Sequence, residues 1–326
     1  MISWRIINAI PSGLQTSSRQ ELDSVFGILR LLPVVNNPLN WARARRNAAP
    51  EKQYSRNFSS FGLKRRELDH LDPLALPSHD FRKPRLFVDA PLGSGATVAL
   101  ARDQSNYLGN VLRLSAGDSI LVFNGRDGEW QASITGRKRP DGLEIATRTR
   151  SQDRLPNLAY VFAPLKHARL DYMVQKAVEM GVSSLQPVLT RFTQVSRVNS
   201  ERMRANVIEA AEQCGILGIA DVAEPVAFDR FLDRRTSERL LVFCDEAADV
   251  TNPLGALQGG KAVAGIDVLI GPEGGFAEEE RAMLRRQPNT IRLSLGPRIL
   301  RADTAGIAAL ALVQAALGDW TEGPGR

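Results

Sequence analysis

The spacing of apolar and polar residues changes twice along this chain of 326 residues. Residues 1–78 hold short apolar patches but follow neither the helix period nor the strand period, and a long polar stretch within them is basic. We expect this extension to be disordered, and residues 1–75 to be dispensable. The alternatives are a targeting leader, or upstream sequence included by mistake before a true start near Leu76.

Short strands dominate residues 79–152. The runs RLFVD, ATVAL and GLEIATRTR predict strands, and QSNYLGNVLRL has the apolar spacing of a short helix. The run DSILVFNGRDGEWQASI predicts a hairpin, because its Asn-Gly and Asp-Gly pairs tolerate the positive φ that tight turns require. Several short strands around one small helix predict a compact β-barrel.

Residues 153–322 alternate between strand and helix patterns. Predicted strands are LAYVFA, SSLQPVL, RLLVFC, IDVLI and TIRLSL, and predicted helices are RLDYMVQKAVEM, ERMRANVIEAAEQC, EEERAMLRR and a final helix, Ala302–Leu317. This alternation predicts an α/β domain with a parallel sheet covered by helices. The last helix is apolar on more faces than one sheet can cover, which favours a homodimer built through this domain.

Composition narrows the functional classes. No apolar run approaches the roughly 20 residues of a membrane-spanning helix, so we expect no membrane span. The three histidines are scattered without metal-ligand spacing, so we expect no metal, and the two cysteines, Cys214 and Cys244, suit reduced core residues.

The net charge of +6 is unevenly distributed. Lys and Arg outnumber Asp and Glu by 11 to 7 over residues 1–80 and again over 81–150, whereas residues 151–326 hold 20 against 22. A basic small domain beside a near-neutral large one suits nucleic-acid binding; a solvated basic surface is an equally good interpretation. Surface arginines of the barrel, Arg85 and Arg113 among them, are candidate RNA contacts.

Two predicted strands end alike, in LIGP at 269–272 and in SLGP at 294–297. Ligands of open α/β sheets bind beyond the carboxyl ends of strands, and glycine allows backbone groups to approach a ligand closely. One such loop would more often be structural, but two with matching chemistry favour a binding site. Neither has the spacing of a dinucleotide fingerprint or a P-loop.

Four ordered motifs carry a family resemblance: PLKHARLDYMVQKAVEMGV, AAEQCG, IGPEGGFAEEE and LSLGPRILRADTA. From Phe81 to about Trp320 the chain resembles the SPOUT-class methyltransferases that modify uridine N3 in bacterial 16S ribosomal RNA. The resemblance implies a PUA-like β-barrel RNA-binding domain over 79–152 and a trefoil-knotted α/β methyltransferase domain over 153–322. It also implies a cytoplasmic homodimer that uses S-adenosylmethionine, with 16S rRNA, within the small ribosomal subunit, as substrate.

The resemblance also implies site residues by position. RNA contacts would include Arg113 and Lys166. Three departures concern Asp303, where the family often has glutamate, Ile216, where it often has arginine, and the segment before Arg113, which lacks paired histidines. The residues expected around the cofactor are Gly271, Pro272, Glu273, Gly274, Leu295, Gly296, Ile299 and Leu300.

The chemistry of this reaction suggests three catalytic residues. Uridine N3 keeps its proton at neutral pH, so the site needs a base or a cation that stabilises the anion on O2 and O4. Arg301 is the candidate cation, and Glu273 or Asp303 would take the proton or orient Arg301. The alternatives are a SPOUT methyltransferase acting on another RNA and a non-catalytic RNA-binding ribosome assembly factor. The sequence leaves open which uridine is modified, and whether free rRNA or the assembled subunit is the substrate.

Overall fold

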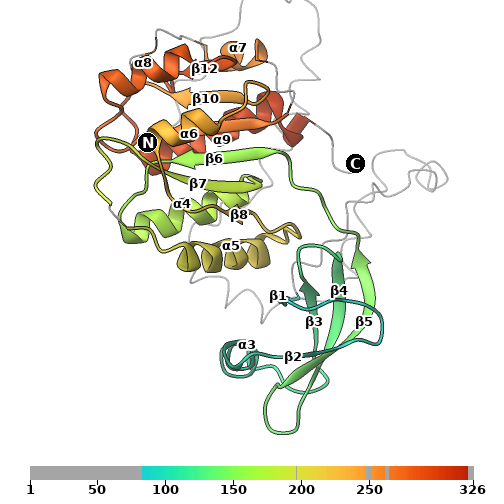
Figure 1. The fold of residues 1–326 in the computed structure, drawn as a ribbon. Helices are drawn as coiled ribbons and strands as arrows, with labels where there is room; N and C mark the ends of the chain where they lie inside the picture. Colours follow the sequence, from blue (N-terminus) through green and yellow to red (C-terminus); the bar gives the residue numbers. More distant parts are fainter. Residues whose placement is uncertain (1–82, 196, 247, 249–251, 261–263, 322–326) are drawn as a thin grey trace, which may run out of the picture. The chain divides into compact units, whose positions relative to one another are not determined.

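The computed structural model describes residues 83–321, except for 196, 247, 249–251 and 261–263 (Figure 1). The predictions made for residues 1–78 lie outside this part of the chain. Within it, the strands form a five-stranded sheet followed in sequence by a seven-stranded one. This division agrees with the change in apolar spacing near residue 153.

The five-stranded sheet has the order β1-β3-β4-β5-β2. Strand β1 runs parallel to β3, and the other neighbours are antiparallel. A short helix α3 continues into one turn of π-helix at Tyr107–Val111, where the single small helix is predicted, and its Leu108 is buried in the core of this sheet. The bounds are β1 Arg85–Phe87, β2 Thr97–Ala99, α3 Arg102–Asn106, β3 Ser119–Phe123, β4 Glu129–Thr135 and β5 Gly142–Arg150.

The predicted hairpin joins β3 to β4. The side-chain oxygen of Asn124 accepts hydrogen bonds from the backbone N–H groups of Arg126 and Asp127, at 3.1 and 2.9 Å. Gly128 has a φ of +86°, and a Cβ there would lie 2.4 Å from the carbonyl oxygen of Arg150. Turn chemistry and lack of space therefore both favour this loop sequence.

The second sheet has the order β12-β10-β11-β6-β7-β8, with β9 also paired to β7, and every pair is parallel. The strands are β6 Leu158–Phe162, β7 Ser184–Leu189, β8 Asp221–Val222, β9 Val226–Ala227, β10 Leu240–Cys244, β11 Ile266–Ile270 and β12 Thr290–Leu293. The helices are α4 His167–Glu179, α5 Ser200–Cys214, α6 Phe228–Arg234, α7 Pro253–Gln258, α8 Glu278–Arg286 and α9 Ala302–Leu317.

Helices cover both faces of this sheet. In β6, Leu158, Tyr160 and Phe162 belong to a core cluster shared with α4, α5, α7 and α9, whereas Ala159 and Val161 belong to a cluster shared with α6 and α8. All five residues of β6 are buried, which explains its continuous apolar run. The predicted α/β fold is confirmed; the trefoil knot stays a prediction.

Some local predictions were incomplete or wrong. Helices α6 and α7 and strands β8 and β9 were not predicted, because elements of two to seven residues are too short to show a period. Cys214 is exposed near the end of α5 rather than in the core, whereas Cys244 is half-buried. No helix in the described part of the chain is long and apolar enough to cross a membrane.

Helix α5 also contacts the five-stranded sheet. The backbone N–H of Phe87 in β1 donates to Oε1 of Glu212 at 2.8 Å, and Nη1 of Arg150 in β5 donates to the carbonyl oxygen of Gly215 at 2.8 Å. Phe123 of β3 is buried in a small cluster with Ala211. Polar and apolar contacts together hold β1, β3 and β5 against the end of this helix.

Candidate functional site

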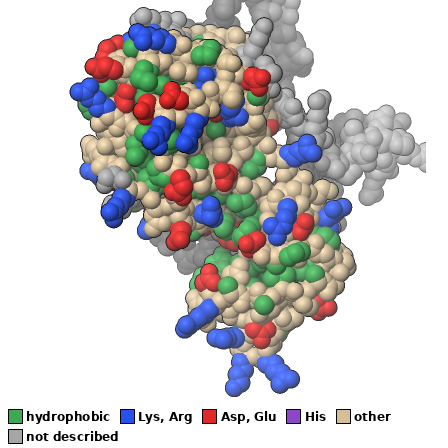
Figure 2. Space-filling model, in the orientation of Figure 1, with side chains coloured by type: hydrophobic (Ala, Val, Ile, Leu, Met, Phe, Trp, Pro, Cys, Tyr) green, Lys and Arg blue, Asp and Glu red, His purple; other side chains and the backbone are tan. Residues whose placement is uncertain are grey.

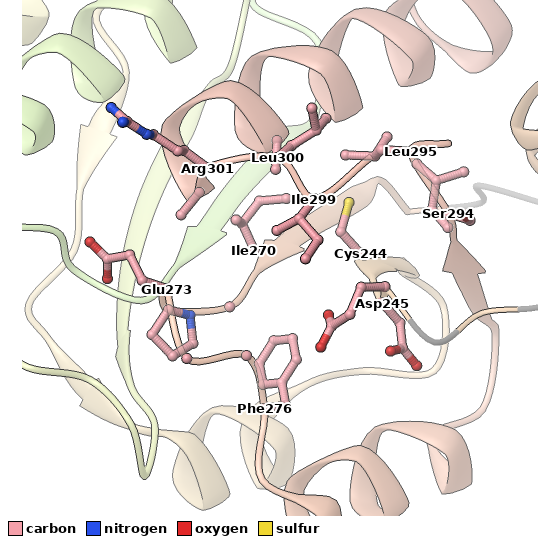
Figure 3. Close-up of a pocket in the computed structure, with 18 of the residues that line it drawn as sticks. Cys244, Asp245, Ile270, Glu273, Phe276, Ser294, Leu295, Ile299, Leu300 and Arg301 are labelled. Atoms are coloured by element: carbon pink, nitrogen blue, oxygen red, sulfur yellow. The ribbon is translucent and has the colours of Figure 1, made fainter. Parts of the chain in front are cut away.

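A cavity of about 420 Å³ lies at the carboxyl ends of three adjacent parallel strands, β10, β11 and β12 (Figure 3). This is the edge at which open α/β sheets bind ligands. Its lining consists of Cys244, Asp245, Glu246, Ile270, Gly271, Pro272, Glu273, Gly274, Gly275, Phe276, Leu293, Ser294, Leu295, Gly296, Arg298, Ile299, Leu300, Arg301, Ala302 and Ala305. The structure thus brings together both predicted glycine loops.

The loop after β11 needs its glycines for space. A Cβ at Gly271 would lie 3.0 Å from the ring of Phe276, and one at Gly274 would lie 3.3 Å from Cβ of Phe192. The loop then turns sharply, since the N–H of Gly275 donates to the carbonyl oxygen of Pro272 at 2.9 Å and Gly275 has a φ of +71°. Glycine is favoured at both positions because a Cβ there would crowd a neighbouring phenylalanine.

The loop after β12 needs its glycine for backbone conformation. Gly296 has a φ of +98°, and no atom lies within 4 Å of the position that a Cβ would take. Three apolar residues of the same loop, Leu295, Ile299 and Leu300, line the cavity, and Ile299 is 97% exposed. A glycine loop flanked by apolar side chains therefore forms one wall.

The third strand, β10, contributes residues that the sequence analysis missed. Cys244 is the last residue of the strand, Asp245 and Glu246 follow it directly, and all three line the cavity. Burial raises the pKa of the Cys244 thiol to about 12, so this thiol is neutral at physiological pH. The signal for these residues was a carboxylate pair after a predicted strand, but the sequence did not show that this strand lies between β11 and β12.

Two arginines hold the carboxylate of Asp245, whose side chain is 1% exposed. Nη2 of Arg292 lies 2.9 Å from Oδ2, and Nη1 of Arg281 lies 3.5 Å from Oδ1. Arg281 also forms an ion pair with Glu246 and donates to the carbonyl oxygen of Phe276 at 3.2 Å. This network fixes the β10 end against helix α8, which follows the first glycine loop.

The predicted catalytic residues differ in position. Glu273 and Arg301 line the cavity, and their charged ends point to the same side of it in Figure 3. Glu273 forms an ion pair with Arg169 of α4, with Nη1 and Oε1 3.8 Å apart. Among the described residues, no carboxylate forms an ion pair with Arg301. Asp303 lies in the first turn of α9, does not line the cavity, and accepts the N–H of Thr304 at 2.8 Å.

The predicted RNA contacts need one correction. Arg85 is 6% exposed, and its Nε lies 2.9 Å from Oε2 of Glu129, whose side chain is equally buried. The prediction that Arg85 is a surface RNA contact is therefore wrong for this structure. Arg113 is exposed and adopts a φ of +57°, and Lys166 is exposed at the start of α4.

Further basic residues lie at the far end of the five-stranded sheet. Arg137, Lys138 and Arg139 are exposed in the turn between β4 and β5. Figure 2 shows Lys and Arg side chains at that end of the molecule, whereas acidic and basic side chains are interspersed over the larger sheet's helices. No group of three or more potential metal ligands occurs within the described ranges.

Comparison with known families identifies both parts of the chain. Residues 152–314 match the model of an RNA methyltransferase domain, and residues 100–144 match that of an RNA methyltransferase PUA domain. Over 235 residues the chain is 30% identical to ribosomal RNA small subunit methyltransferase E of Rickettsia conorii, a match that covers 71% of this chain and 94% of that protein. The chain belongs to the ribosomal RNA small subunit methyltransferase E family.

Other members of this family agree. The methyltransferase E of a Synechocystis species is 34% identical over 231 residues, or 68% of this chain and 74% of that one. The crystal structure of methyltransferase E from Neisseria gonorrhoeae bound to S-adenosyl methionine has a TM-score of 0.64 and 29% identity, covering 72% of this chain and 97% of that chain. The structure of a putative methyltransferase of Legionella pneumophila with bound cofactor has a TM-score of 0.62 and 29% sequence identity. This match covers 72% of this chain and 98% of that chain.

These matches confirm the family resemblance, the enzyme class and the fold that the sequence predicts. The cavity lining includes all eight residues expected around the cofactor, Glu273 among them, together with Arg301. Their individual roles stay predictions.

Proposed function

We propose that this chain transfers a methyl group from S-adenosylmethionine to N3 of a uridine in 16S ribosomal RNA of the small subunit. The observation that carries the proposal is the cavity at the ends of β10, β11 and β12, in a family member whose crystallised relatives bind S-adenosyl methionine. The names of the relatives support small-subunit rRNA over another RNA, and their bound cofactor favours an enzyme over a non-catalytic assembly factor.

The lining residues fit this cofactor. Leu295, Ile299 and Leu300 offer apolar surface for the adenine ring, and the two glycine loops leave backbone groups free to approach its polar edge. When bound, the cofactor supplies a methyl group on a sulfonium centre.

The substrate side of the reaction would depend on Arg301 and Glu273. Uridine N3 must lose its proton to become nucleophilic, and the resulting charge spreads onto O2 and O4. The Arg301 guanidinium is always charged and presents a planar pair of N–H donors to such oxygens. No carboxylate among the described residues forms an ion pair with it. Glu273 lines the cavity whereas Asp303 does not, which favours Glu273 as the proton acceptor.

Three further features complete the proposal. Arg113 and Lys166, both exposed, would contact RNA phosphates. Arg113 belongs to residues 79–152, the RNA-binding domain, and Lys166 to residues 153–322, the domain that binds the cofactor. The enzyme would act in the cytoplasm as a homodimer. The dimer is supported by the exposure of Ile299 and by α9, on which Ile307 and Leu312 are only half-buried and Ala315 is exposed.

The proposal is tested with small ribosomal subunits from a strain that lacks this gene. The purified protein and isotopically labelled S-adenosylmethionine should label one uridine of 16S rRNA. Methylation at N3 blocks the Watson–Crick edge, so reverse transcription of the product should stop next to that nucleotide. Label on another RNA, or at another atom, would refute the assignment; binding of the cofactor without transfer would indicate an assembly factor.

A further inference from the structure

The loop between β7 and α5 begins with a tightly closed turn. The N–H of Thr193 donates to the carbonyl oxygen of Thr190 at 3.1 Å, and the N–H of Thr190 donates to Oγ1 of Thr193 at 2.9 Å. The two hydroxyl oxygens lie 2.8 Å apart, within hydrogen-bonding distance. Three hydrogen bonds across four residues fix the two residues between them, Arg191 and Phe192.

This turn is attached to the helix that follows the first glycine loop. The N–H of Arg191 donates to Oε1 of Glu280 at 2.7 Å, and the other oxygen of that carboxylate accepts the N–H of Ala277 at 2.9 Å. Glu280 is 8% exposed, so both bonds are shielded from water. One buried carboxylate thus fixes the turn relative to the start of α8.

Phe192 is exposed at the tip of this fixed turn. The residue is 45% exposed, although a large apolar side chain is normally buried, and its Cβ lies 3.3 Å from the position of a Cβ on Gly274. Gly274 belongs to the cavity lining, next to Glu273. The guanidinium carbon of Arg191 lies 5.9 Å from the ring centroid. An exposed aromatic ring on a fixed backbone turn, with a cation close to it, therefore lies next to the rim of the cavity.

We propose that Phe192 is a stacking platform for an unpaired nucleobase of the RNA substrate, with Arg191 beside it to contact the RNA. The inference rests on the proposed function, because N3 lies on the Watson–Crick edge and can be reached only in an unpaired uridine. A base taken out of a helix loses its stacking partners, and an aromatic side chain replaces them. Because Gly274 has no side chain, Phe192 can lie directly against this part of the cavity lining.

Four variants distinguish stacking from simple packing. Phe192→Tyr and Phe192→Trp keep an aromatic face, Phe192→Leu keeps apolar volume without one, and Phe192→Ala removes both. Tyr172→Leu is the matched control, since Tyr172 is an equally exposed aromatic residue, at 47%, with Nζ of Lys176 5.6 Å from its ring centroid. The probe is a single-stranded uridine oligonucleotide with one 2-aminopurine, whose fluorescence is quenched on stacking.

The wild-type protein and the Tyr and Trp variants should bind the probe and quench it. The Leu and Ala variants should bind about tenfold more weakly and lose the quenching, since stacking on one aromatic ring has this size. The slope of affinity against salt should stay unchanged, because no phosphate contact is lost. Affinity for S-adenosylmethionine, measured by calorimetry, should also stay unchanged.

Three outcomes would each overturn the proposal that Phe192 is a stacking platform. The first is that Phe192→Leu binds and quenches the probe as wild type does, and the second is that Tyr172→Leu loses as much as Phe192→Leu. The third is that Phe192→Leu is a monomer in light scattering. The last result would mean that the ring contacts a second copy of the chain. Methyl transfer to small subunits is measured in parallel. A wild-type protein that quenches the probe but transfers no methyl group would refute the proposed function while supporting the platform.

Discussion

The backbone N–H of Phe87 and the carboxylate of Glu212 join β1 to α5 through a hydrogen bond of 2.8 Å. Burial raises the pKa of Glu212 above its ordinary value, the hydrogen bond from Phe87 lowers it, and the nearby charge of Glu209 raises it further, with a net shift upward. The contact between the five-stranded sheet and α5 therefore contains a carboxylate that is destabilised when ionised.

Glu212→Gln tests this effect through pH. Because the pKa is raised on folding, the folded chain keeps a proton that the unfolded chain has lost, and stability decreases as pH rises through the interval between the two pKa values. Glutamine can still accept from Phe87 but has no charge. The variant should gain stability relative to wild type as pH rises across this interval. The gain should vanish well below the unfolded pKa of about 4.3, where the carboxyl group is protonated in the folded and the unfolded chain. Urea unfolding across pH measures it, with exposed Glu224→Gln as control.

Arg85→Ala should destabilise the fold rather than weaken RNA binding directly. Removing Arg85 leaves the Glu129 carboxylate buried without its nearest cation, a change that costs about 3 kcal/mol or more. The exposed Arg113 is the comparison: Arg113→Ala should change the free energy of unfolding by less than about 0.5 kcal/mol but lower the salt slope of RNA binding by about one. Equal stability of the two variants in urea would contradict the burial of Arg85.

Arg301→Ala should lower turnover about 100-fold or more, the size expected for one preorganised electrostatic contact to a developing anion. Affinity for S-adenosylmethionine should stay within about threefold of wild type, because the arginine is assigned to the substrate. Arg301→Lys should recover only part of the rate, since an ammonium lacks the planar fork. Turnover is measured with saturating small subunits; a wild-type rate in the alanine variant would remove Arg301 from the mechanism.

A pair of carboxylate variants separates the candidate proton acceptors. Glu273→Gln keeps the size of a side chain that lines the cavity but removes its basicity, and should lower the turnover number about 100-fold. Asp303→Asn keeps an oxygen that can accept from Thr304, so the start of α9 is preserved and turnover should change little. The reverse order of effects would assign the proton to Asp303.

Gly296→Ala tests the second glycine loop. Alanine at a φ of +98° is strained, even though no atom would touch its Cβ. A cost of roughly 1–2 kcal/mol would distort the loop and weaken binding of S-adenosylmethionine about tenfold. Gly93→Ala is a matched control, since its Cβ also meets nothing within 4 Å and its φ is not in the positive range. Calorimetry should show no loss in the control.

The sequence was informative wherever chemistry and period were local. The apolar run of β6 and the glycines at 271 and 296 predicted a buried parallel strand and two ligand loops. Arg85 was misjudged because its partner, Glu129, is 44 residues away and only the pairing of β1 with β3 and β3 with β4 brings them together. Cys244 and Asp245 were missed for a similar reason, because the order of strands in the sheet differs from their order along the chain.

The position of β10 between β11 and β12 has a consequence for synthesis of the chain. Strand β10 ends at Cys244, but its neighbours begin only at Ile266 and Thr290, and the second wall of the cavity runs to Arg301. A nascent chain cannot assemble this pocket until its residues as far as Arg301 have left the exit tunnel. During synthesis, the end of β10 would therefore stay without both of its neighbours until β11 and β12 have emerged.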